Sequence, residues 1–234
     1  MASIINGLNP APVIMEIMRI FPDGLVITSG FYALITQSIP FAIFCMSMIE
    51  ATGIYYFLRW ASSYMNIAPV TPRASGKYNA ICRTGFTDPT SPTLLSLSLF
   101  SASIDSTDIL QHFPSSPIYM ISAASAYVFS SLNAQSNDLA ALGPTFSAKY
   151  YISMVFLFLF IAAFMCFRIF NSCETFATVM LSVPIGLIVG ILLVQQNLRL
   201  FNKSGINLLG IPQMSSVTAN GQKLYVCPKT ATNG

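Results

Sequence analysis

The length of its stretches without charged side chains constrains this chain most. The runs 24–49, 150–167 and 175–197 contain no Asp, Glu, Lys or Arg. Each is at or near the roughly 20 residues that a helix needs to cross a hydrocarbon core. A soluble domain carries about a quarter of its residues as charged groups, whereas here the fraction is 8%. We therefore expect an integral membrane protein.

Two shorter uncharged segments, 89–104 and 117–132, lie between the first and second of these runs. Both are rich in serine and shorter than a lone span requires. Either one could cross only when packed inside a bundle, and re-entrant or surface-lying segments are the alternative. The predicted fold is an all-α membrane protein, a helical bundle of three long and two shorter transmembrane segments over residues 24–199.

The two termini are expected to lie outside this bundle. In the N-terminal segment 1–23, the stretch Ala11–Phe21 is apolar around most of a helix but too short to cross, and Pro22-Asp23-Gly24 is expected to end it. An interfacial helix is predicted there. In the hydrophilic segment 200–234, Asn220-Gly221 is a strong turn signal. A small hairpin or docking tail is expected to follow the last span.

Glycine and proline positions inside the predicted spans indicate how the helices pack. Gly186 and Gly190 form a GxxxG pair, which lets another helix backbone approach closely. Pro184 lies just before this pair. Pro40 lies within the run 24–49, where its missing backbone N–H predicts a kink. These four residues are the predicted helix-packing positions.

Glu50 follows the first predicted span directly and is the candidate for an intramembrane or interfacial acid. An acid inside the membrane is costly and often functional, so a proton or cation site is one interpretation. The interpretation that the sequence favours is an interfacial carboxylate near Arg59, within an aromatic belt of Tyr55, Tyr56 and Trp60. A proton relay would need a second ionisable group inside another long span, and none is present.

Basic residues near the spans predict orientation. The loop 59–88 carries four basic residues against one acid, and the chain from Arg199 onward carries basic residues and no acid. The positive-inside rule therefore places both segments on the cytoplasmic side. The residues of the tail that we expect to contact a partner are Lys203, Lys223, Tyr225 and Lys229.

The five cysteines form no CxxC pair, so neither a disulfide framework nor a zinc site is predicted. Cys45 and Cys166 lie within predicted spans and are expected to pack as small apolar side chains. Cys82 and Cys227 would share the basic side, which leaves a disulfide between them open. Cys173 would lie on the opposite side.

No catalytic, cofactor or metal site is predicted. The only histidine is His112, which could share a helix face with Asp105 and Asp108, but Pro114 and Pro117 favour a turn here. Nucleotide-binding motifs are absent from the sequence. A net charge of +3 without a basic stripe excludes a nucleic-acid-binding protein. We therefore expect no enzymatic activity, no cofactor and no bound metal.

Four short motifs follow Cys82 along the rest of the chain. They are Asp88-Pro89-Thr90-Ser91-Pro92, Asn171-Ser172-Cys173, Asn207-Leu208-x-Gly210-Ile211-Pro212 and Tyr225-Val226-Cys227-Pro228. With these motifs the chain resembles the multi-pass membrane proteins of large icosahedral nucleocytoplasmic DNA viruses. The resemblance implies a component of the internal virion membrane beneath a capsid, with capsid or other assembly proteins as partners.

The segment Ser91-Pro92-Thr93 is also similar to the start of the phosphatase motif of the phosphatidic acid phosphatase superfamily. That motif needs one histidine close to this segment and a second further on, and the single histidine of this chain cannot fill both roles. The similarity therefore implies at most a scaffold without catalytic residues. The leading functional hypothesis is a structural membrane protein that anchors a protein assembly to an internal membrane. The alternative is a small transporter or channel subunit.

Overall fold

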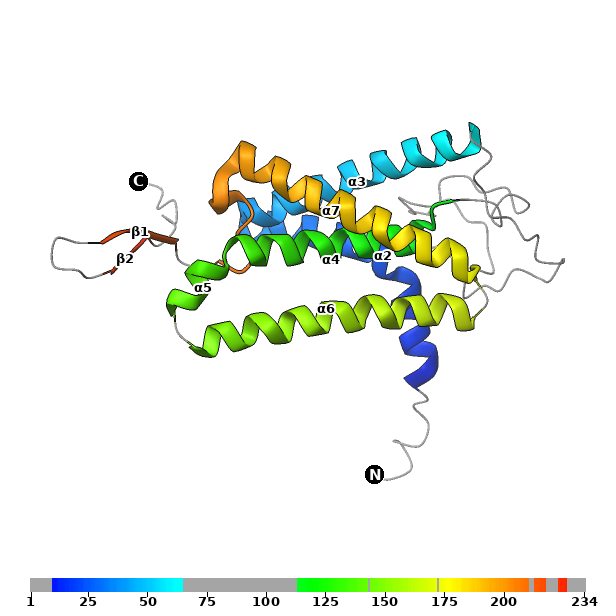
Figure 1. The fold of residues 1–234 in the computed structure, drawn as a ribbon, viewed down its shortest axis with the longest axis horizontal. Helices are drawn as coiled ribbons and strands as arrows, with labels where there is room; N and C mark the ends of the chain where they lie inside the picture. The colour runs from blue at the N-terminus through cyan, green and yellow to red at the C-terminus, as the bar shows by residue number, and fades with distance from the viewer. Residues whose placement is uncertain are drawn as a thin grey trace, which may run out of the picture.

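The computed structural model describes residues 10–64, 113–142, 144–171, 173–210, 213–217 and 223–226. Its helices are α2 (Pro10–Thr36), α3 (Ile39–Tyr64), α4 (Ser116–Ala134), α5 (Ser136–Leu142), α6 (Pro144–Phe170) and α7 (Phe176–Gly205). Its strands are β1 (Gln213–Val217) and β2 (Lys223–Val226). The long helices form a bundle, drawn horizontally in Figure 1. The predicted all-α, membrane-type bundle is confirmed.

Three of the described helices are long and apolar enough to cross a membrane, over Ile39–Ser62, Tyr150–Phe170 and Phe176–Gly205. The predicted spans 150–167 and 175–197 lie within the second and third. α6 is the least buried of the three, and large side chains such as Phe158, which is 72% exposed, cover its outer face. An exposed apolar surface of this extent is stable only against lipid or another protein.

The first predicted span, 24–49, is wrong because the chain reverses inside it. α2 ends and α3 begins on either side of Gln37, whose φ of 52° lies in the left-handed region. The two helices then pack side by side, with Cys45 Sγ donating to the carbonyl oxygen of Val26 at 3.6 Å. An uncharged run of this length fits one tilted span or a helical hairpin equally well, so hydropathy did not distinguish them.

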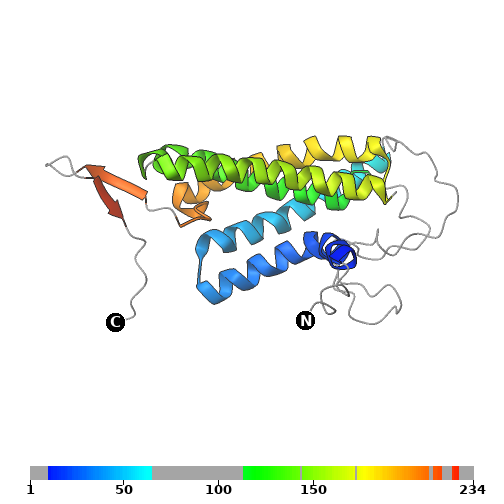
Figure 2. The same cartoon turned by 90° about the horizontal axis from the view of Figure 1, so that it is seen from below.

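Two prolines act differently from the prediction. Pro40 lies in the first turn of α3, where a missing N–H removes no helical hydrogen bond, so it begins a helix and does not kink one. Pro22, which was expected to end the N-terminal helix, lies inside α2. The beginning of α2 crosses the bundle while the rest runs along it (Figures 1 and 2). An internal proline is a common cause of such a bend.

α4 is the centre of the bundle. Every residue of Pro117–Tyr127 is buried, so the shorter predicted segment 117–132 is a helix enclosed by its neighbours. The hydrogen-bonded pairs Ser115–Ser182 and Tyr127–Asn197 show that α4 runs parallel to α7. The other shorter segment, 89–104, lies outside the described residues.

The bundle has two ends. We name one the Cys173 end, after the connection between α6 and α7 that contains Cys173, and the other the hairpin end, after β1 and β2. At the Cys173 end, Ser62 Oγ of α3 donates to the carbonyl oxygen of Phe113 just before α4. At the hairpin end lie the α2–α3 turn and the end of α7, and β1 and β2 project beyond the helices (Figure 1). α3 therefore ends at the Cys173 end and α7 at the hairpin end. Arg59 and Arg199 therefore lie toward opposite ends of the bundle, because α4 runs along it between α3 and the later helices. The side of the membrane that each faces stays a prediction.

The strands β1 and β2 form an antiparallel pair, with Gln213 opposite Val226. The hairpin expected in the tail is therefore present. Of the residues predicted to dock a partner, Lys223 and Tyr225 lie on β2. Lys229 lies outside the described residues.

The backbones of α4 and α7 touch at two points. A Cβ added at Gly186 would lie 2.7 Å from the Cβ of Ser122, and one at Gly190 would lie 2.8 Å from the Cβ of Ala126. Both would lie closer still to a backbone carbonyl oxygen of α4. The predicted GxxxG pair thus lies at the α4–α7 contact, whereas Pro184 is on the exposed side of α7.

Replacing Gly190 with Ala should lower the free energy of unfolding by about 1–3 kcal/mol, because the new methyl group meets rigid backbone. Reversible denaturation in detergent micelles measures this. Gly24→Ala is the matched control, since a Cβ there would lie 3.5 Å from Ile20 Cγ2, an ordinary contact. Equal losses in the two variants would contradict the close α4–α7 approach.

Candidate functional site

A buried polar layer joins α3, α4 and α7. Asn197 Nδ2 on α7 donates to Ser47 Oγ on α3 at 2.7 Å and to the Tyr127 hydroxyl on α4 at 2.9 Å. None of the three residues is more than 5% exposed. Polar groups buried in an apolar interior are costly unless they are hydrogen-bonded. The layer therefore holds the three helices in one register.

Tyr119, about two turns before Tyr127 on α4, adds another hydrogen bond between α4 and α3. The Tyr119 hydroxyl donates to the carbonyl oxygen of Ala51 on α3 at 2.9 Å. Its ring packs against Tyr55, with ring centroids 5.7 Å apart. The hydroxyl groups of Tyr119, Tyr127 and Ser47 are all hydrogen-bonded to neighbouring helices, so the polar layer accounts for its own hydrogen bonds.

Glu50 lies beside this layer on the outside of the bundle. Gln196 Nε2 on α7 is 3.2 Å from each carboxyl oxygen of Glu50, and both side chains are exposed. Glu50 is near the middle of the span Ile39–Ser62, about 16 Å along the helix axis from Ile39 at 1.5 Å per residue. A place near the middle of a candidate span favours the intramembrane interpretation over the interfacial one.

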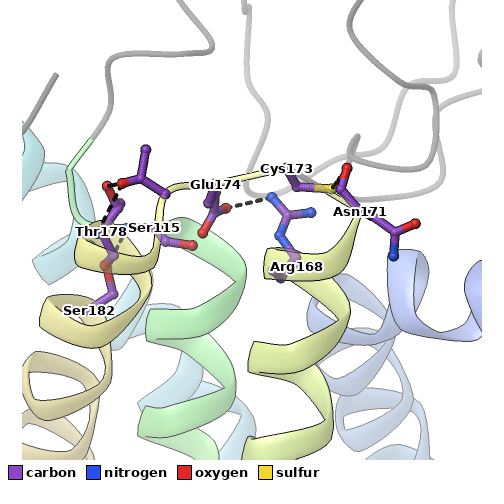
Figure 3. A network of polar contacts seen from close by, with 8 residues as sticks. Ser115, Arg168, Asn171, Cys173, Glu174, Thr178 and Ser182 are labelled. Atoms are coloured by element: carbon purple, nitrogen blue, oxygen red, sulfur yellow. Dashed lines mark hydrogen bonds and ion pairs between the residues drawn. The ribbon is translucent and has the colours of Figure 1, made fainter. Parts of the chain in front are cut away.

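A second polar cluster closes the Cys173 end, as Figure 3 shows. Arg168 at the end of α6 and Glu174 before α7 form an ion pair with 2.5 Å between Nη2 and Oε1. Their side chains are only 6% and 15% exposed. The backbone N–H of Cys173 also donates to the Arg168 carbonyl oxygen at 2.9 Å. The ion pair and this bond hold the short connection between the two spans.

Hydroxyl groups tie the start of α4 to α7 at the same end. Ser182 Oγ accepts from the Ser115 N–H at 2.7 Å and donates to the Thr178 carbonyl oxygen at 2.6 Å. Thr175 caps α7 by accepting from the Thr178 N–H at 3.3 Å. Ser182 is fully buried and its hydrogen bonds go to backbone, which is a structural role.

The described cysteines include both free and disulfide-bonded side chains. Cys45 and Cys166 are free thiols, whereas Cys173 is disulfide-bonded. The remaining cysteines of the chain, Cys82 and Cys227, lie outside the described residues. The disulfide between Cys82 and Cys227 that the sequence left open therefore stays a hypothesis.

Asp23 was not singled out as a site residue by sequence reasoning, which expected it at the end of the N-terminal helix. It lies inside α2, is fully buried, and neither carboxyl oxygen has a hydrogen-bond partner. α2 is not among the three candidate spans. Burial raises the pKa of this carboxyl from 3.8 to about 7. The one sequence signal was an acid within an otherwise apolar helical stretch.

A metal site needs several ligand side chains close together in the fold. No group of three or more His, Cys, Asp or Glu side chains that could hold a metal ion occurs among the described residues. The sequence trio of Asp105, Asp108 and His112 lies outside them.

No protein-family model, curated protein or solved structure matches the chain. The resemblance to viral internal-membrane proteins therefore stays a prediction. Function has to be argued from the bundle and its polar groups.

Asn197→Leu should lower the free energy of unfolding by about 1–2 kcal/mol, because the Tyr127 hydroxyl loses its side-chain partner in an apolar interior. Unfolding in micelles measures the change. Gln195→Leu, two positions earlier on the exposed side of α7, should leave stability unchanged. A neutral Asn197→Leu would show that the layer does not hold the helices.

Stability should fall as the pH rises from about 4 to about 7. Because the pKa of Asp23 is about 7 in the folded chain and 3.8 otherwise, the folded state binds more protons within this window. Unfolding in micelles across that range measures the slope, which Asp23→Asn should remove. Asp138→Asn, in the first turn of α5, is the control and should keep it. An unchanged slope in Asp23→Asn would contradict the assignment.

Proposed function

We propose that this protein is a structural, non-enzymatic membrane protein that anchors a protein assembly to an internal membrane. The observation that carries the proposal is the division between an apolar helical bundle and a hairpin beyond one of its ends (Figure 1). The outer face of α6, with large apolar side chains such as Phe158, suits lipid. The buried hydroxyl and amide groups described above are used in contacts between helices, as an anchor requires.

The hairpin end is the proposed docking side. A two-stranded hairpin leaves backbone groups unpaired along both outer edges and is marginally stable alone, so an added strand from a partner would complete it. Lys203, which is half exposed and lies 3.7 Å from Asp138, adds a basic group close by. Following the resemblance, we propose a capsid or other assembly protein as the partner.

The orientation of the chain follows from the disulfide. A disulfide at Cys173 favours an oxidising compartment at that end. The hairpin end then faces the cytoplasmic or capsid side, where Arg199 and Lys203 agree with the positive-inside rule. We propose this orientation in place of the shared side expected for the two basic segments.

A small transporter or channel subunit is the second candidate, and Glu50 is the observation that favours it. Ionisable groups at this depth often mark ion pathways. Among the described residues, however, the side chain that bonds to Glu50 is the amide of Gln196, and no second ionisable group completes a relay. The anchor is therefore the better-supported function.

A chain that ends at Gly210 should insert into membranes normally but lose its place in the assembly. The cut leaves Ile206, which is fully buried in the bundle core, and removes the hairpin. Resistance to carbonate extraction measures insertion, because the spans supply the apolar transfer energy. Co-purification with the assembly isolated from the source membrane measures docking.

A control chain carries a Gly/Ser linker of equal length in place of residues 211–234. This control separates the loss of the docking sequence from the loss of length, and it should also fail to join the assembly. Normal incorporation of the shortened chain would rule out the tail as the docking element. Hydrolysis of a lipid phosphate or ion conduction by the purified chain in vesicles would overturn the structural assignment.

A further inference from the structure

One face of α3 presents exposed positions along most of the helix. They recur at alternating intervals of four and three residues, at Met46, Glu50, Gly53, Phe57, Trp60 and Tyr64. This is the spacing with which one helix packs along another. Glu50 on this face bonds to Gln196 of α7, whereas the large side chains of Met46 and Phe57 are 65% and 62% exposed.

Gly53 lies at the centre of this face. A Cβ added there would have no neighbour within 4 Å, in contrast to Gly186 and Gly190 at the α4–α7 contact. No contact within the described bundle requires a glycine at position 53. Between helices in lipid, small residues let two backbones approach closely.

Glu50, one turn before Gly53, gives this face a chemical requirement. Hydrocarbon offers no hydrogen-bond donors, so a carboxyl group at this depth needs them from protein. Within the described residues the one donor is Gln196 Nε2, which the two carboxyl oxygens share. Arg199, one turn beyond Gln196, is also exposed. An acceptor on α3 and donors on α7 therefore lie side by side on the outer surface.

We propose that two copies of this chain associate through the α3 face, around a two-fold axis along the membrane normal. Copies inserted in the same orientation place Glu50 of each at the depth of Gln196 of the other. Under a two-fold axis the contact is reciprocal: each Glu50 accepts from Gln196 of the other copy. Gly53 of the two copies then meets across the axis.

The same side chains select a second copy over an unrelated partner. An unrelated helix would have to bring its own donors to the depth of Glu50, whereas a second copy brings Gln196 and Arg199 there by symmetry. α6 provides the contrast, because its exposed face around Phe158 and Ala163 holds no charged side chain. That face suits lipid.

Cysteine cross-linking in lipid vesicles tests the geometry. Cys166 is exposed, so the experiment uses full-length chain with Cys166→Ala. Adding Gly53→Cys should give a covalent dimer on mild oxidation, because the two copies of position 53 face each other. Ala163→Cys on α6 is the matched control and should stay monomeric.

Energy transfer between dye-labelled chains, measured as the chains are diluted with lipid, tests whether Glu50 and Gly53 are needed for association. Glu50→Leu and Gly53→Leu should each weaken association at least tenfold, since one removes the polar contact and the other separates the backbones. Ala163→Leu should leave association unchanged. Unfolding in monomeric micelles should be similar for all three, because neither Glu50 nor Gly53 is buried within one chain.

Three results would overturn the proposal. The unaltered chain could stay monomeric at all lipid dilutions, or Ala163→Cys could cross-link as well as Gly53→Cys. Gly53→Cys could also cross-link in native membranes to a different protein and never to itself, which would assign another occupant to the face. Loss of docking in the shortened chain bears on the tail and leaves this test unaffected.

Discussion

The contact between α4 and α7 is the interaction on which the rest of the bundle depends. α4 is short and rich in Ser and Ala, so it is stable at membrane depth only when its polar groups have partners. Gly186 and Gly190 let the two backbones touch. Toward the two ends of the contact, Ser182 accepts a hydrogen bond from the Ser115 N–H and Asn197 donates one to Tyr127. α3 and α6 pack against this pair of helices.

The polar groups of the bundle are of two kinds, those that bond between helices in its interior and those on its outer surface. Asn197 and Ser182 face inward and are occupied by bonds between helices. Glu50 and Gln196 form a comparable pair on the outer surface. The proposed anchor function uses the apolar surface and the hairpin, and the proposed association of two copies uses the outer polar pair. The two roles therefore lie on different parts of the molecule.

Part of the candidate site was predictable from particular residues. The GxxxG pair named Gly186 and Gly190 because close helix packing leaves a local sequence pattern. Glu50 stood out because acids are rare in such a chain, but it lies near the middle of the candidate span Ile39–Ser62 and not directly after a span, since the predicted span began one helix too early. Neither Asn197 nor Asp23 was identified, because burial and hydrogen-bond partners come from other helices and leave no local pattern.

Sequence by itself determined that this is a helical membrane protein, with α6 and α7 as spans and a hairpin after them, because hydropathy and turn chemistry are local properties. Tertiary structure decided where the chain reverses and which ends share a side. A reversal at Gln37 and a straight helix through it have the same hydropathy, so packing of α2 on α3 made the choice. The shorter segment at α4 is enclosed in the bundle because α7 supplies its partners, and its run along the bundle places the end of α3 and the end of α7 at opposite ends.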